Sequence, residues 1–251
     1  MDPLSPFLFI LETEVLSRLL IRQESQALPK GIKIACSCAP ISHLLFADDL
    51  ILFAIVTSKE VFNLNSCLEL YNRWSGQSIN ISKSSIHFSK NTTTSTINSI
   101  SGIFPFKRAS IFSKYLGLPL SFGKAKFAAF KDKLEKVSRK IEGWRAKTLS
   151  QAGRTILIKS AAATIPSYAM STFLLPTSLT FTLDRIFKKN WWGFPKDKSR
   201  NLSLKSCSSI CLPKEDGGLG FRHMHEFNLS LITKLRWKLM SNADCLWVNQ
   251  L

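Results

Sequence analysis

Residues 43–54 read HLLFADDLILFA, and they place two adjacent carboxylates, Asp48 and Asp49, inside an almost entirely apolar run. A buried carboxylate without a partner costs several kcal/mol or gives up its charge. The interior of a strand is therefore a poor place for this pair. We predict two strands, with residues 32–36 and 44–45 leading toward the pair and residues 50–54 leading away, joined by a turn whose exposed tip presents both carboxylates.

A helix is expected before this hairpin. Pro6 suits a first helical turn, and the helix should end near Arg22, before the turn-prone SQALPKG. Its apolar residues recur at spacings of three and four, which predicts one buried face: Leu8, Leu11, Val15 and Leu19.

Further elements follow the hairpin. We expect a helix over residues 58–74, stopped by Ser75-Gly76, with its buried face formed by Val61, Leu64, Leu68 and Tyr71. The alternating segment 78–89 predicts a half-buried strand, residues 91–96 a polar loop, and KYLGLPL (114–120) a short strand or turn.

The clearest helical pattern runs from Lys124 to Trp144. Its apolar stripe consists of Phe127, Phe130, Leu134, Val137, Ile141 and Trp144. Lysines and arginines fill the positions between, so this helix should have a core face and a basic face. Three more helices are expected, over residues 150–164 with Ser150 as cap, 178–192 and 226–240.

Charge is distributed unevenly along the 251 residues. Thirty-four Lys and Arg oppose 17 Asp and Glu, a net charge of +17. Residues 1–100 contain 8 basic and 8 acidic side chains, whereas residues 101–251 contain 26 and 9. Such a balance indicates an acidic partner, either nucleic acid or an anionic membrane surface. The longest uncharged stretch, 160–183, contains Pro166 and Pro176, so we expect no membrane span.

Six cysteines and no secretory leader favour a reduced, intracellular setting without disulfides. Cys207 and Cys211, followed by His223 and His225, raise the question of zinc. Two histidines separated by one residue rarely close a structural zinc site, so we do not expect zinc here. Four tryptophans, Trp191, Trp192, Trp237 and Trp247, are expected in the core rather than stacked on bases.

Adjacent carboxylates at an exposed turn suit a hard divalent cation, although a solvated acidic turn is the plainer alternative. Several segments nevertheless resemble reverse transcriptase motifs in the family's order. FADD (46–49) resembles the metal-binding motif, MDPLSPFLFILETEVLSRLL (1–20) the preceding motif and its helix, SGQSINISKS (75–84) the next palm motif, and YLGLPL (115–120) the motif that grips the primer end.

The downstream region extends the resemblance to nearly the whole chain. WRAKTLSQAGRTILIKSAAATIPSYAMSTFLLP (144–176), NWWGFP (190–195) and LPKEDGGLGFR (212–222) are similar to the region after the palm in plant long interspersed (non-LTR) retrotransposons. The resemblance implies templated addition of deoxynucleotides by a two-metal mechanism with Mg²⁺ or Mn²⁺.

Site residues follow from this resemblance by position. Asp48 would be a metal ligand, and Asp49 a second ligand or an organiser of the turn. Phe46 and Ala47 would shape the primer-end site. Lys83 falls where the family places a possible proton donor to pyrophosphate, although an ordinary exposed lysine is an equal alternative. The turn and helix that line the nascent base pair would be set by Pro3, Ser5 and Pro6, although a plain helix start needs no catalysis.

The sequence also departs from the family. It begins after the strand that carries the other catalytic aspartate, and it lacks the fingers and the Gln-Gly ahead of the first motif. We therefore expect a truncated relative that cannot polymerise alone. The alternatives are a non-catalytic nucleic-acid-binding remnant and a fold relic without a biochemical role, which would aggregate through an unpaired sheet edge.

Residues 107–159 hold 14 Lys and Arg against three acidic residues, and by resemblance they include the thumb. Such a face binds phosphates by releasing counterions, without reading bases; the alternative is a merely solvated lysine-rich helix. The expected contact residues are Lys126, Lys133, Lys136, Arg139, Lys140 and Arg145.

The expected architecture is α+β: an incomplete polymerase palm over residues 1–121, a basic helical thumb over 122–200, and a helical connection over 201–251. The expected partners are an RNA template and a DNA primer, with no membrane. We expect an intracellular protein, and the nucleus is compatible with this function.

Overall fold

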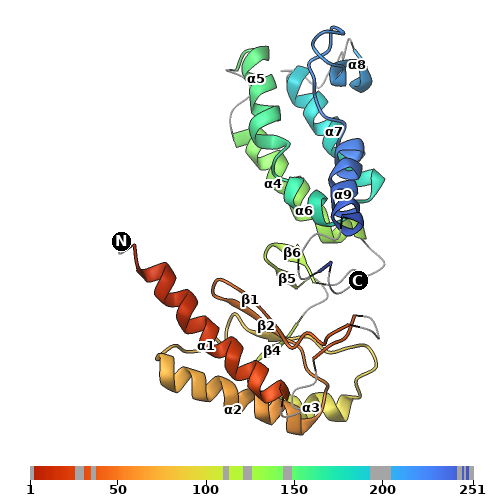
Figure 1. Cartoon of the computed structure of the whole chain (residues 1–251). Helices are drawn as coiled ribbons and strands as arrows, with labels where there is room; N and C mark the ends of the chain where they lie inside the picture. Colours follow the sequence, from red (N-terminus) through yellow and green to blue (C-terminus); the bar gives the residue numbers. More distant parts are fainter. Residues whose placement is uncertain are drawn as a thin grey trace. The chain divides into compact units, whose positions relative to one another are not determined.

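The computed structural model describes residues 3–25, 31–34, 38–109, 113–120, 126–143, 149–192, 205–241, 245 and 247–248. The chain forms two compact units, one of Met1–Ser110 with Asp244–Leu251 and one of Ile111–Ala243 (Figure 1). We call them unit 1 and unit 2. This division differs from the expected boundaries at residues 121 and 200, and the names palm and thumb stay predictions.

Unit 1 contains three helices and two small sheets among its described residues. Its elements are α1 (Ser5–Ser25), β1 (His43–Phe46), β2 (Asp49–Leu52), α2 (Ser58–Ser75), β3 (Ser85–Ile86), α3 (Thr94–Ile103) and β4 (Lys107–Arg108). β1 and β2 form an antiparallel hairpin, whereas β3 and β4 pair in parallel.

Helix α2 has the buried face that its sequence predicts. Thr57 caps its start by accepting a hydrogen bond from the Glu60 N–H, and Gly76 ends it at φ 70°. The core of unit 1 consists of Leu16, Leu20, Val61, Leu64, Cys67, Leu68, Tyr71, Ile100 and Phe104.

The buried face predicted for α1 is wrong. Leu8 and Leu11 are 60% and 65% exposed, whereas Leu16 and Leu20 are buried. Helix α1 packs against α2 and β1, and these neighbours cover its second half. Sequence spacing gives a helix its apolar stripe, but the neighbouring elements decide which part of it is buried.

The region after α2 also differs from expectation. Only Ser85 and Ile86 of segment 78–89 form a strand, because the chain turns at Asn80, which accepts hydrogen bonds from the Lys83 N–H. Helix α3 was not expected: Thr93 caps it, and residues 94–96 are helical, so the second half of the predicted polar loop 91–96 is wrong. Its Ile100 is buried in the core, so packing overrides a Ser- and Thr-rich sequence of weak helix propensity.

Unit 2 is mainly helical in its described residues. Its elements are the antiparallel hairpin β5 (Lys114–Tyr115) and β6 (Leu118–Pro119), then α4 (Lys126–Gly143), α5 (Gln151–Leu157), a π-helical turn (Ile158–Ala162), α6 (Ser167–Thr172), α7 (Thr177–Trp192), α8 (Cys207–Cys211) and α9 (Met224–Met240). Thus the four helices expected from residue 124 onwards are confirmed, and α6 and α8 are additional.

The core of unit 2 joins α4, α6, α7, α8 and α9. Four positions of the predicted stripe on α4 are buried: Phe130, Leu134, Val137 and Ile141. Phe127 is 40% exposed, and Trp144 lies outside the described residues. Trp191 and Trp192 pack against this core as expected, but Trp237 is 68% exposed, so its predicted core position is wrong. In the described part of the chain, no helix is long and apolar enough to cross a membrane.

Candidate functional site

The tip of the β1–β2 hairpin presents the adjacent carboxylates. Phe46 pairs with Asp49 in the antiparallel register, which leaves Ala47 and Asp48 as a two-residue turn. Both carboxylates are exposed. The predicted hairpin and its exposed tip are therefore confirmed.

Opposite faces of the hairpin have different surroundings. Leu45, Leu50 and Leu52 share one face by strand alternation and pack against the core of unit 1. Phe46 and Asp49 lie on the other face, where Phe46 is 60% exposed. The hairpin is thus held by one face, while the other offers an aromatic ring beside a carboxylate to solvent.

Polar contacts fix the base of the hairpin to α1. His43 Nε2 and Ser17 Oγ are 2.8 Å apart, and Ser42 Oγ donates to Glu24 Oε2 at 2.8 Å. Burial lowers the pKa of His43, despite the nearby carboxylates of Glu24 and Glu14, and so favours the neutral imidazole. Ser42 Oγ also lies 3.0 Å from Nδ1 of His43, so a neutral ring can accept from the Ser17 hydroxyl at Nε2 and donate to the Ser42 hydroxyl from Nδ1.

The turn itself is strained. Ala47 has φ 50°, in the left-handed region that costs a residue with a Cβ about 1 kcal/mol. Ala47 directly precedes Asp48, so the strained residue lies next to the expected metal ligand. Ala47 is also, with Phe46, one of the residues expected to shape the primer-end site.

The other motif residues of unit 1 lie on separate elements. Ser5 is the first residue of α1 and Pro6 the second, with Pro3 in the preceding turn. Lys83 is exposed, in the turn after Asn80. Within the described ranges, no hydrogen bond or ion pair joins Lys83 or Ser5 to either aspartate, and no third potential metal ligand gathers with Asp48 and Asp49.

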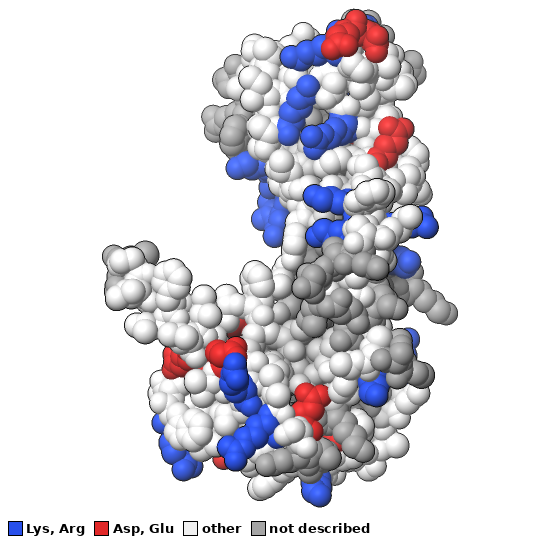
Figure 2. Space-filling model, viewed as in Figure 1, with Lys and Arg blue, Asp and Glu red and all other residues white. Residues whose placement is uncertain are grey.

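The two units differ in charge. Unit 1 contains 10 Lys and Arg against 9 Asp and Glu, and unit 2 contains 24 against 8, so unit 2 has a net charge of +16. Figure 2 shows more blue than red over the helices of unit 2 in this view. The exposed cations of α4 are Lys126, Lys131, Lys136, Arg139 and Lys140. Arg145, an expected contact residue, lies outside the described residues.

Lys133, also an expected contact residue, is engaged inside unit 2. Its Nζ donates to the Gly117 carbonyl at 3.0 Å, and burial lowers its pKa. Lys114 Nζ lies 2.7 Å from Asp132 Oδ2. Both contacts tie α4 to the β5–β6 hairpin, whose turn residues Leu116 and Gly117 have φ 50° and 75°, as in a type I′ turn.

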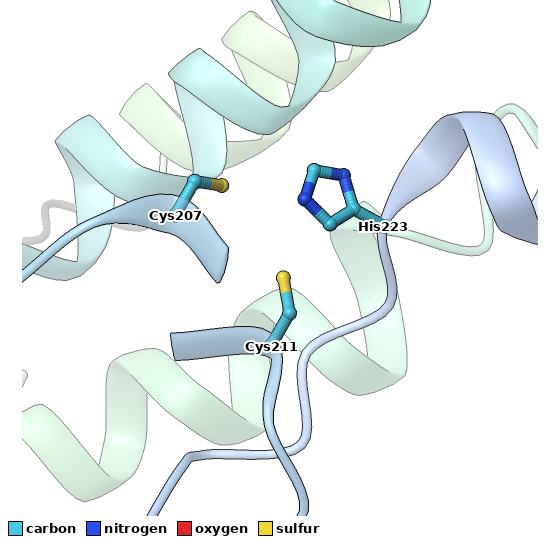
Figure 3. A group of neighbouring side chains, drawn as sticks. All are labelled: Cys207, Cys211 and His223. Atoms are coloured by element: carbon cyan, nitrogen blue, oxygen red, sulfur yellow. The ribbon is translucent and has the colours of Figure 1, made fainter. Parts of the chain in front are cut away.

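A second group of chemically active side chains lies in unit 2. Cys207, Cys211 and His223 each offer a ligand atom, and these atoms lie within 4.8 Å of one another (Figure 3). We expected no zinc because His223 and His225 are separated by one residue, but among the described residues only His223 belongs to this group, and His225 does not. The spacing of residues 207, 211 and 223 matches no recognisable zinc motif. In the sequence, the Gly217-Gly218 pair indicates that the chain could reverse between Cys211 and His223.

Comparison with known proteins finds relatives in Arabidopsis thaliana. The chain is 41% identical over 118 residues to a protein named "Putative ribonuclease H protein"; the match covers 47% of this chain and 19% of that protein. It is 56% identical over 48 residues to one uncharacterized mitochondrial protein, covering 19% of this chain and 39% of the relative. It is 36% identical over 83 residues to a second uncharacterized mitochondrial protein, and this match covers 33% of this chain and 53% of the relative.

These matches are partial on both sides. The chain spans between about a fifth and about half of the length of these relatives. Relatives of this kind are typical of retrotransposon-derived open reading frames. No protein-family model matches the chain.

Proposed function

We propose that this chain is part of the catalytic region of a retrotransposon reverse transcriptase. Asp48 is the ligand for Mg²⁺ or Mn²⁺, and Asp49 is a second ligand or organises the turn. The observation that carries the proposal is the exposure of both carboxylates at a hairpin tip anchored to α1, in a chain whose motif segments follow the order of that family. The retrotransposon-related relatives support it.

Each part of the proposed site has a physical role. Carboxylate oxygens are the ligands that these hard cations prefer, and bound nucleotide phosphates complete the coordination. The exposed ring of Phe46, beside Asp49, packs against the primer end. The exposed cations of α4 contact the phosphates of the template and primer.

The metal ligand can be tested directly on the chain. Mn²⁺ titration should broaden the NMR amide signals of residues around 46–50, because a paramagnetic ion relaxes nearby nuclei, and Asp48→Asn should abolish the effect. The matched control is Asp216→Asn, because Glu215 and Asp216 are also adjacent, exposed acidic residues at a turn. Broadening that persists in Asp48→Asn would contradict the assignment.

Catalysis needs a separate experiment. Primer extension on an RNA template would compare the chain, its Asp48→Ala variant, and the chain joined to the upstream fingers and palm of a plant non-LTR reverse transcriptase. We expect extension by the joined protein and its loss with Asp48→Ala. Joined proteins that extend equally well with and without Asp48 would refute the catalytic role.

A second function, nucleic-acid binding without catalysis, is favoured by the net charge of +16 on unit 2. Binding that weakens steeply with salt, needs no Mg²⁺ and is unchanged in Asp48→Ala would support this function, provided that the joined protein also fails to extend a primer.

A further inference from the structure

Cys207, Cys211 and His223 of unit 2 lie together, although their spacing in the sequence matches no recognisable motif. Cys207 and Cys211 occupy the two ends of α8, one helical turn apart, and therefore share a face. Ser206 caps this short helix by accepting a hydrogen bond from the Ser209 N–H at 3.1 Å. Figure 3 shows both sulfur atoms pointing toward the ring of His223.

The connection between α8 and α9 returns His223 to the cysteines. Gly220 N–H donates to the Leu212 carbonyl at 2.7 Å, and Leu219 N–H to the Ile210 carbonyl at 3.0 Å, so this loop lies directly on α8. A Cβ at Gly218 would overlap the Leu212 backbone, and Gly220 has φ 63°. These positions need glycine, and the close return that they permit positions His223.

Asp184 on α7 orients the His223 ring. Its Oδ2 lies 2.9 Å from Nδ1 of His223, and its Oδ1 accepts from the Met224 N–H at 3.1 Å. Asp184 is only 6% exposed, so this contact is sheltered from water. A ring that donates its Nδ1–H to a carboxylate keeps the lone pair of Nε2 for a metal, the usual outer-shell arrangement of histidine ligands.

From this geometry we propose that Cys207, Cys211 and His223 bind one zinc ion, with Asp184 as the positioning residue of the histidine. Tetrahedral zinc with bonds of about 2.0–2.3 Å places its ligand atoms about 3.5–3.8 Å apart. The three ligand atoms here lie within 4.8 Å of one another. Side-chain rotations that move these atoms by roughly an ångström would bring them to the spacing that zinc needs.

The donor set selects the metal. Two thiolates and one imidazole favour Zn²⁺ over Mg²⁺ and Ca²⁺, which prefer oxygen ligands. A small cavity beside the cluster, lined by Asp184, Phe187, Cys207, Ile210, Cys211 and Phe221 among others, has a volume of about 10 Å³. This volume is at the lower limit for one water molecule, and a water molecule bound to the ion would supply the fourth ligand.

The ion would join α8 to the start of α9, and Asp184 would link α7 to the site through His223. Within the described residues, α8 is a single helical turn, too short to be stable by itself. Binding needs two thiolates, so two protons leave as zinc enters. The site therefore stabilises unit 2 and is independent of the carboxylates of unit 1.

The primary test is the zinc content of the purified chain, measured by mass spectrometry, together with Co²⁺ titration followed by thiolate-to-cobalt absorption. We expect one zinc ion per chain and one cobalt ion with the absorption of two thiolate ligands. Chelation should lower the melting temperature of unit 2. A chain that purifies without zinc and shows no thiolate-to-cobalt absorption would overturn the proposal, as would a Cys207–Cys211 disulfide in chain prepared without oxidant.

Variants then assign the ligands. Cys207→Ser, Cys211→Ser and His223→Gln should each lose the bound zinc, and Asp184→Asn should weaken it about 10- to 100-fold. The matched controls are Cys245→Ser and His225→Gln, which remove a cysteine and a histidine outside the cluster and should keep one ion per chain. Equal zinc in the Cys211→Ser variant and in the controls would also overturn the proposal, because it would place the ion elsewhere.

Discussion

Units 1 and 2 place different chemistry on different kinds of scaffold. Unit 1 is nearly neutral, has nine buried apolar core residues among those that the structure describes, and exposes two carboxylates on a hairpin. Unit 2 has a net charge of +16, a core with 16 buried apolar residues in its described part, and a thiol–imidazole cluster. The proposed metal ligands for chemistry and the proposed charges for nucleic-acid binding therefore belong to separate units, and each can be removed without the other.

The largest expected effect concerns the charges of α4. We expect replacement of all five exposed cations by glutamine to weaken nucleic-acid binding by roughly 10³-fold at low salt, because counterion release from phosphates supplies most of such affinity. The salt dependence should fall by about one unit of slope for each lost phosphate contact. Fluorescence anisotropy with a labelled RNA–DNA duplex measures both quantities.

A control of equal charge is available on unit 1. Its five replacements by glutamine are at exposed residues: Arg18, Lys33, Lys59, Arg73 and Lys90. Both variants have the same net charge, so net charge alone predicts equal losses. Equal losses would thus break the contrast between the units.

Core truncation should separate the stabilities of the two units. Leu20 in unit 1 and Leu183 in unit 2 are both 0% exposed. We expect Leu183→Ala to cost about 4 kcal/mol and Leu20→Ala about 3 kcal/mol, because α1 is covered over only half its length and can shift to fill the cavity. Hydrogen exchange during urea unfolding would assign each loss to its unit. If each variant instead makes both units unfold together, the two units form one cooperative body, and the expected separation of their stabilities is wrong.

A buried amide gives the next effect. Asn228 on α9 donates to the carbonyls of Met170 and Phe173, and accepts from the Leu175 N–H at 2.8 Å. We expect Asn228→Ala to cost about 3 kcal/mol, because three backbone groups lose a hydrogen bond to Asn228, two of these bonds being buried. In unit 1, Glu60 accepts from the Ile55 N–H, so Glu60→Ala should cost about half as much. Chemical denaturation of each variant measures the difference.

Acid should weaken unit 1 through His43. Its pKa is lowered by burial in the folded state, so the neutral ring stabilises unit 1 above pH 6.5, and this stability is lost as pH falls through the lower folded pKa. The slope is at most about 1.4 kcal/mol per pH unit. His43→Gln should flatten this dependence in hydrogen exchange of β1 and β2. An unchanged slope would assign the acid sensitivity to other groups.

Local sequence patterns predicted the elements whose apolar stripe is wholly or mostly buried, such as α2 and α4. They failed where a distant partner decides the outcome. Spacing could not show that Leu16 and Leu20, rather than Leu8 and Leu11, meet other elements. Spacing also led us not to expect a metal at Cys207, Cys211 and His223, because their approach depends on a glycine turn that lies against α8, with 12 residues separating Cys211 from His223.

The smallest expected effect compares two strained turns. Ala47 in unit 1 and Leu116 in unit 2 both have φ 50°. Ala47→Gly should raise the free energy of unfolding of unit 1 by about 0.5–1 kcal/mol, because glycine has no Cβ to clash, although its freedom in the unfolded chain offsets part of the gain. Leu116→Gly should gain less in unit 2, because the half-buried leucine also loses packing.

Primer extension by the joined protein gives this pair a second readout. If the strain at Ala47 serves only to close the hairpin, Ala47→Gly should keep its activity, since the register of Phe46 and Asp49 is unchanged. If the strain positions Asp48, the variant should be more stable and less active, while Leu116→Gly keeps full activity. A loss of stability in Ala47→Gly would contradict both readings, because it would mean that the alanine side chain contributes contacts worth more than the strain.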